Sequence, residues 1–148
     1  MDIKFEPRPY QKSIIETTNN KLVLLCERIL NKYNQSQESY SKQLKLLYEM
    51  EKIADYYKQI AEFLNKNHDK LNLSRETKIL YEDVGLLLND VYLLYYTFSQ
   101  EKLILIRNKK RELIARAEVL LNSTKDGVVI AYLLSITHIL SEIENLCL

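Results

Sequence analysis

The scarcity of glycine and proline constrains the fold of this chain more than any other feature. Only 2 Gly and 2 Pro occur among its 148 residues, against usual shares of about 7% and about 5%. Sandwiches, barrels and doubly wound sheets change direction every few residues and rely on such residues at their turns. The composition therefore predicts an all-α protein with few connections, and the length suits a single domain spanning residues 1–148.

Apolar residues recur every three or four positions over five segments, which is the spacing of amphipathic helices. Short polar stretches separate these segments, so we expect an antiparallel up-and-down bundle of about five helices. Pro7 and Pro9 disfavour helix immediately before them, which predicts an extended arm over residues 1–9. The expected helices start at Tyr10 and cover about 10–30, 38–66, 75–98, 101–122 and 128–146, the last being central because it is apolar on more than one side.

The balance of charge argues against several classes of protein. There are 21 Lys+Arg against 20 Asp+Glu, so no global field favours nucleic acid or an anionic membrane. No apolar run approaches the ~20 residues that span a bilayer, and the N-terminal segment lacks the apolar core of a secretory signal. We expect a cytoplasmic protein without membrane insertion, in which Cys26 and Cys147 are small buried hydrophobic residues.

The sequence carries no motif that indicates an enzyme. A phosphate-binding G-x-x-x-x-G-K-[ST] loop cannot be built from Gly85 and Gly127 alone. No H-E-x-x-H or C-x-x-C motif occurs, nor a recognisable Ser-His-Asp order. We therefore expect a protein without catalytic activity.

Paired acids on the second helix are the strongest candidate for a binding site. Glu51 and Asp55 are four residues apart, so their carboxylates point the same way on a helix. With Lys58 and Glu62 they form a stripe along one edge of the apolar face. Like charges at this spacing repel, and either a neighbouring lysine or a hard cation would offset the repulsion. The alternative is a solvated edge of ordinary surface ion pairs.

The residues around this pair resemble the signature helix of the PhoU phosphate-uptake regulators. The shared order is Leu-x-x-x-Glu-x-Ile-Ala-Asp-x-x-x-x-Ile-Ala-Glu, starting at Leu47 and ending at Glu62. Members of that family contain a three-helix bundle twice in tandem, with an acidic motif on each third helix that holds iron or zinc clusters in some members. The resemblance implies a non-enzymatic regulator of phosphate uptake or signalling that contacts a transporter ATPase or a sensor kinase. It also implies Glu51 and Asp55 as metal ligands, with Glu62 or Glu49 at the periphery.

The chain also departs from the PhoU pattern. Residues 74–148 have the layout of a second three-helix copy, but Ser141 and Asn145 stand where Glu and Asp would be expected. His138 and Glu142 could supply a replacement ligand pair, although a half-buried, hydrogen-bonded histidine is the preferred interpretation. The first copy lacks one helix, which predicts a homodimer that covers an otherwise exposed apolar face.

Two further features bear on possible partners. The basic run Arg107–Arg111, followed by Arg116, is expected to be a solvated face, with a phosphate- or RNA-binding edge or an acidic partner as alternatives. The 11 Tyr residues are interleaved with leucines, which favours core and subunit packing over base stacking. These features define the competing hypothesis, a small helical accessory subunit of a larger complex that handles nucleic acid.

Overall fold

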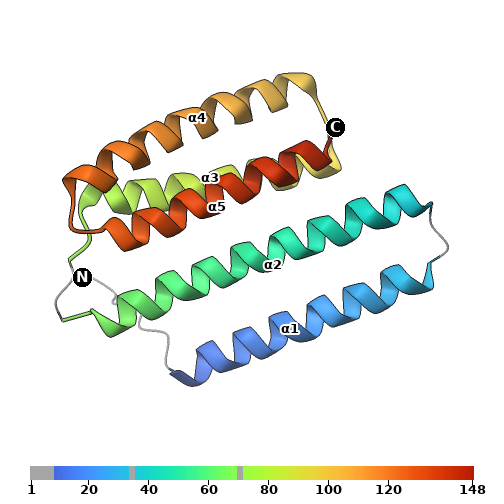
Figure 1. Cartoon of the computed structure of the whole chain (residues 1–148), viewed down its shortest axis with the longest axis horizontal. Coiled ribbons are helices and arrows are strands. Elements are labelled where there is room, and N and C mark those ends of the chain that lie inside the picture. The colour runs from blue at the N-terminus through green and yellow to red at the C-terminus, as the bar shows by residue number, and fades with distance from the viewer. Residues whose placement is uncertain (1–8, 34–35, 70–71) are drawn as a thin grey trace. The chain divides into compact units, whose positions relative to one another are not determined.

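Five α-helices make up the fold, as the computed structural model of the chain shows for residues 9–33, 36–69 and 72–148 (Figure 1). The all-α bundle predicted from the periodicity is confirmed. Each observed boundary lies within two residues of the predicted one. The helices are α1 (Pro9–Lys32), α2 (Gln37–Lys66), α3 (Arg75–Tyr96), α4 (Gln100–Ser123) and α5 (Gly127–Leu146).

Side-chain caps explain where two of the helices begin. The Ser74 side chain accepts a hydrogen bond from the Thr77 amide at the start of α3, and Ser99 does the same for Lys102 at the start of α4. Such caps satisfy amides that lack a partner within the helix. Pro9 opens α1, where its missing N–H is harmless. The predicted extended arm otherwise falls on residues 1–8, outside the described residues.

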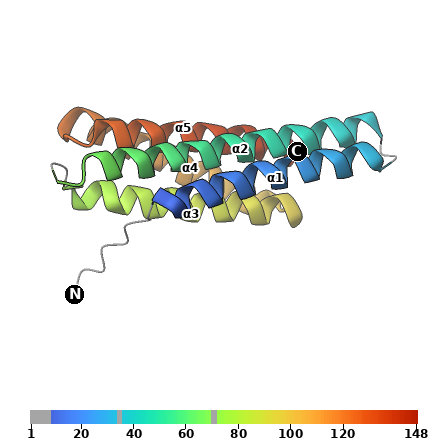
Figure 2. The ribbon, with the colours of Figure 1, turned by 90° about the horizontal axis from the view of Figure 1, so that it is seen from below.

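The chain divides into two compact units, residues 1–54 and 55–148. In the described part of unit 1, α1 and the first half of α2 run side by side as a helical hairpin (Figure 2). Two exposed hydrogen bonds join them: the Tyr40 hydroxyl donates to Asn31 Oδ1 at 2.8 Å, and the Tyr48 hydroxyl donates to Glu27 Oε1 at 2.9 Å. That residues 1–148 form one domain stays a prediction.

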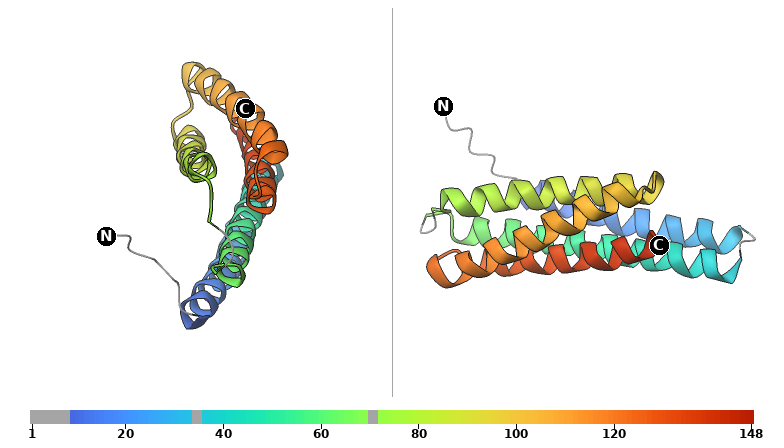
Figure 3. Two further views of the ribbon diagram at one scale, coloured as in Figure 1. Left: turned by 90° about the vertical axis from the view of Figure 1, so that its left-hand side faces the viewer. Right: turned by 90° about the horizontal axis from the view of Figure 1, so that it is seen from above.

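Unit 2 contains the end of α2 and a bundle of α3, α4 and α5, each of which packs against the other two. Figure 3 shows α4 crossing α5 at an angle, with α3 alongside. Helix α5 has eight buried residues, against six for α3 and four for α4, which agrees with the prediction that it is central. Side chains from all four elements make the core: Ile60, Leu80, Val84, Leu87, Val91, Leu94, Leu103, Ile106, Leu113, Ala117, Val129, Ile130, Leu133, Ile136, Leu140 and Ile143.

By length and composition alone, α5 could also cross a membrane. Its buried residues, among them Ile130, Leu133 and Ile136, face the other helices of unit 2. Core helices of soluble proteins can have the same length and composition, so these two properties alone do not assign α5 to a membrane.

Candidate functional site

The acidic residues predicted as metal ligands all lie on α2, where the two units divide. Glu51 belongs to unit 1 and is half-buried, whereas Asp55 and Glu62 belong to unit 2. Asp55 is exposed and Glu62 is half-buried. Glu49 is buried and forms an ion pair with Lys52 at 3.1 Å. Glu49 is therefore already partnered within the chain.

The donors on α2 do not complete a metal site by themselves. Glu62 is seven residues beyond Asp55, about 10 Å along a helix, whereas two ligands of one ion lie within a few ångströms of each other. Among the residues that the structure describes, no three His, Cys, Asp or Glu side chains gather where they could hold a metal ion. The iron or zinc site stays a prediction of the resemblance.

The corresponding positions of α5 differ from what the sequence suggested. His138 is exposed, so the expected half-buried histidine is wrong. Glu142, one turn further along, is also exposed, whereas Ser141 is half-buried and donates to the Thr137 carbonyl at 3.4 Å. The buried polar residues of α5 are Thr137 and Glu144, because the core-facing stripe of α5 passes beside His138 rather than through it.

The basic run on α4 is not a simple solvated face, because four of its cations form ion pairs with acids of α3 and α5. The Glu144 carboxylate is 2% exposed and accepts from Arg107 Nε and, at 2.9 Å, from Lys110 Nζ. Lys109 binds Asp90 at 2.7 Å, and Arg116 binds Asp83 at 2.7 Å. Two cations compensate the buried Glu144, which could not remain charged alone in the core.

Asp126 ties the turn before α5 to the start of α3. Its Oδ2 accepts from the Ser74 amide at 2.9 Å and from the Thr77 hydroxyl at 2.8 Å. Asp126 and Thr77 are both buried. A carboxylate is favourable at the N-terminal end of a helix, where amides are unpaired and the dipole is positive. The contact stabilises the bundle and requires no ligand.

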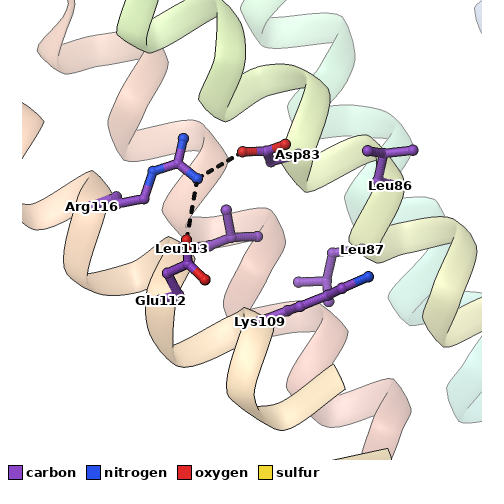
Figure 4. Close-up of a pocket in the computed structure, with 7 residues that line it drawn as sticks. All are labelled: Asp83, Leu86, Leu87, Lys109, Glu112, Leu113 and Arg116. Carbon is purple, nitrogen blue, oxygen red and sulfur yellow. Dashed lines mark hydrogen bonds and ion pairs between the residues drawn. The ribbon is translucent and has the colours of Figure 1, made fainter. Parts of the chain in front are cut away.

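A groove lies between α3 and α4 in unit 2 (Figure 4). Its volume is about 190 Å³, below the roughly 300–1,000 Å³ of typical small-molecule sites. The Asp83–Arg116 ion pair crosses it, and Glu112 lies 3.9 Å from the same guanidinium. The lining residues are Asp83, Leu86, Leu87, Lys109, Glu112, Leu113 and Arg116.

Sequence reasoning missed this groove, although its signal is in the sequence. Acids occur every seven residues on α3, at Glu76, Asp83 and Asp90, and cations occur every seven residues on α4. A spacing of seven keeps residues on one side of a helix. Because the two helices are antiparallel neighbours, the acidic and basic rows face each other. The cations are Lys102, Lys109 and Arg116.

The cysteines and tyrosines differ in environment. Cys26 is exposed, so the expectation that it is buried is wrong, while Cys147 is half-buried. Burial, followed by the charge of Glu144, raises the pKa of the Cys147 thiol. Burial raises the pKa of Tyr57 to about 12, with a smaller effect from Tyr81, whose ring lies edge-on with centroids 5.7 Å apart. The raised pKa disfavours the reactive thiolate of Cys147, so this residue is not an activated nucleophile.

The tyrosines near the end of α3 form a surface cluster. The Tyr92 and Tyr96 ring centroids are 4.9 Å apart, and those of Tyr95 and Tyr96 are 5.5 Å apart. Tyr92 and Tyr96 are exposed. Tyr92 and Tyr96 therefore do not pack in the core, and subunit packing stays a prediction for them, whereas Tyr56 and Tyr57 do pack against Tyr132 and Tyr81.

Comparison with known proteins found no relative of this chain. No protein-family model matches the chain, and neither the curated proteins nor the solved structures contain a match. What can be inferred about function thus depends on the surfaces described above.

Proposed function

We propose that this protein is a non-enzymatic regulator that acts by contact with other proteins, and that the α1 surface binds the partner. One observation carries the proposal: α1 exposes apolar side chains along one side. Leu22, Leu25 and Ile29 follow at steps of three and four and are about half exposed. Apolar residues grouped in this way on a helix are typical of a docking surface for another helix or an apolar groove.

The hydrogen bonds between α1 and α2 fit the same role. Glu27 and Asn31 of α1 accept hydrogen bonds from tyrosines of α2, and both of these bonds are exposed to solvent. Such exposed polar contacts add little free energy, so the hairpin can adjust when a partner covers its apolar side. We propose a partner that offers an apolar helix or groove.

The resemblance to PhoU regulators supplies a more specific form of the proposal. In this form the partner is a transporter ATPase or a sensor kinase. The protein acts from the cytoplasm and restrains the uptake of phosphate by the cell. The support is the sequence pattern of α2, together with three consecutive helices, α3 to α5, as the resemblance implies for one family repeat. Residues Glu51 and Asp55 would hold iron or zinc only with further ligands from outside the described residues.

Phosphate uptake by cells tests the regulatory proposal. Removing the chain, or replacing it with the double variant Leu25→Asp/Ile29→Asp, is expected to raise uptake under phosphate-replete growth to the same extent. The control is Leu148→Asp, which places the same charge at an exposed leucine outside α1. Uptake that is unchanged when the chain is absent would contradict the phosphate form of the proposal.

Metal analysis of the purified protein tests the site on α2. Iron, zinc or manganese that is present in the wild type and lost in Glu51→Gln/Asp55→Asn would support the ligand assignment. A metal-free protein with intact regulation would remove metal from the proposal and leave the contact function. Salt-sensitive binding to DNA or RNA would instead support the competing hypothesis of a nucleic-acid accessory subunit.

A further inference from the structure

We propose that the outer side of α3 and α4 is a self-association surface that binds the same surface of a second copy. We call this surface the α3–α4 face. It consists of the groove in Figure 4 and the apolar residues that border it. The inference goes beyond the regulatory proposal and does not depend on it, because it concerns unit 2 and a different surface from α1.

Apolar residues border the groove in two rows with a seven-residue spacing. On α3 the row is Ile79, Leu86 and Leu93, and all three are exposed. On α4 Leu105 and Val119 occupy the equivalent row, with Glu112 between them. Leu86, Leu105 and Val119 are 63%, 61% and 68% exposed. Side chains that repeat every seven residues on neighbouring antiparallel helices are typical of helix bundles in which further helices pack on that side.

The charges inside the face select a second copy as the occupant. The α3 side is acidic, through Asp83 and Asp90, and the α4 side is basic, through Lys109 and Arg116. A twofold axis parallel to the helices places α3 of each copy opposite α4 of the other. Each acidic row then meets a basic row at the same height, so the face is complementary to itself.

The other face-to-face arrangement is disfavoured by the same charges. A twofold axis perpendicular to the helices would place α3 opposite α3 and bring Asp83 and Asp90 against the same acids of the second copy. Juxtaposed like charges destabilise an interface. Because Asp83 and Asp90 are already paired within each chain, covering them in the favoured arrangement leaves no isolated charge in the interface.

The dimensions of the face suit a small but stable interface. Helix α3 (Arg75–Tyr96) extends over roughly 30 Å, and two adjacent helices are about 20 Å wide. The resulting footprint of roughly 600 Å² approaches the ~800 Å² that each partner contributes to a standard interface. The groove itself is too small for most organic ligands, whereas leucines of a facing helix would fill it.

Light scattering and sedimentation of the full-length protein over a range of concentrations test the proposal. The wild type is expected to be a dimer. Leu86→Glu should weaken the dimer roughly 30-fold or more, with unchanged helical circular dichroism because the side chain is exposed. The matched control is Leu148→Glu, since Leu148 is 65% exposed and lies outside the face. If Leu86→Glu fails to fold, Leu105→Glu serves in its place.

Disulfide trapping tests the arrangement of the two copies. In a Cys26→Ser/Cys147→Ser background, chains with Leu86→Cys are mixed with chains with Glu112→Cys and then oxidised. The favoured arrangement places these two positions opposite each other, so the mixed dimer is expected as the main product. The disfavoured arrangement would instead crosslink Leu86→Cys chains to one another.

Three results would overturn the proposal. A wild type that stays monomeric at concentrations of 100 µM would show that the face does not self-associate. A dimer that withstands both Leu86→Glu and Leu105→Glu would place the interface elsewhere. Crosslinking of Leu86→Cys chains only to one another would contradict the acidic-to-basic arrangement.

Discussion

Helices α1 and α4 have the same length, 24 residues, and both carry apolar residues at helical spacing, yet they differ in what they bury. Helix α4 buries Leu103, Ile106, Leu113 and Ala117 in the core of unit 2. None of the α1 side chains described, from residue 16 onward, is buried. An amphipathic pattern therefore shows that a helix can pack, whereas burial depends on the partners that surround it.

The polar contacts of the two units differ in the same way. Unit 2 contains the buried carboxylates of Glu144 and Asp126, each bonded to two partners. The hairpin of unit 1 is joined by exposed tyrosine hydrogen bonds. Buried charged networks are costly to disrupt, while exposed bonds contribute little. We infer that unit 2 dominates the free energy of unfolding and that unit 1 is free to respond to partners.

Shortening one leucine in each unit should give the largest difference. Leu133→Ala in α5 removes a side chain that is 0% exposed, and we expect a loss of about 2–5 kcal/mol in the free energy of unfolding. Leu25→Ala in α1 changes a side chain that is 51% exposed, and we expect about 0.5 kcal/mol or less. Urea denaturation measures both, and equal losses would contradict the contrast.

Removing a carboxylate charge from each unit should give the next largest difference. Glu144→Gln leaves Arg107 and Lys110 without their buried partner, and we expect a loss of about 2–3 kcal/mol because both cations can still reach water. Glu38→Gln breaks the exposed pair with Lys42 in unit 1, and we expect less than about 0.5 kcal/mol. A Glu144→Gln protein as stable as the wild type would show that the buried network is not stabilising.

Alkaline titration should reveal the burial of Tyr57 in unit 2. Its pKa is about 12 in the folded protein, above the ordinary value of about 10. The folded state therefore retains a proton that the unfolded state loses, and this contribution to stability disappears as the pH rises from about 10 to 12. Absorbance at 295 nm is expected to show a late ionisation that Tyr57→Phe removes. A Tyr57→Phe protein with an unchanged titration curve would contradict this assignment.

The two cysteines should show the smallest difference between the units, which is only a difference in how fast each thiol is modified. Cys26 on α1 is exposed, whereas burial raises the pKa of Cys147 after α5. Since the thiolate is the reactive form, a disulfide reagent at pH 8 is expected to modify Cys26 first. Single Cys→Ser variants identify each kinetic phase. Faster modification of Cys147 would place it in a more open environment than the structure shows.

The helices could be predicted from the sequence because periodicity and caps are local signals. The range 38–66 predicted for α2 agrees with Gln37–Lys66, and the start predicted for α3 at residue 75 agrees with Arg75. Contacts between helices could not be predicted in this way. The partner of Arg107 is Glu144, 37 residues away, and spacing along α4 alone gives no indication of it. The exposure of Cys26 likewise depends on what covers α1.

The candidate sites follow the same division. The acidic pattern of α2 was visible in the sequence, but a metal site needs ligands from several elements, which spacing on one helix cannot supply. The facing charge rows of α3 and α4 were also visible as seven-residue repeats. They acquire meaning only when the two helices are known to be antiparallel neighbours, which is information that the fold provides.

Native-state hydrogen exchange of the full-length protein tests the central claim most directly, because it measures local opening in both units at once. We expect the amides of α5 to exchange only through global unfolding. The amides of α1 from residue 16 to Lys32 are expected to exchange at least ~100-fold faster, through local opening that leaves α3 to α5 folded. Equal protection of α1 and α5 would contradict the account, since it would show that the hairpin is as firmly held as the core.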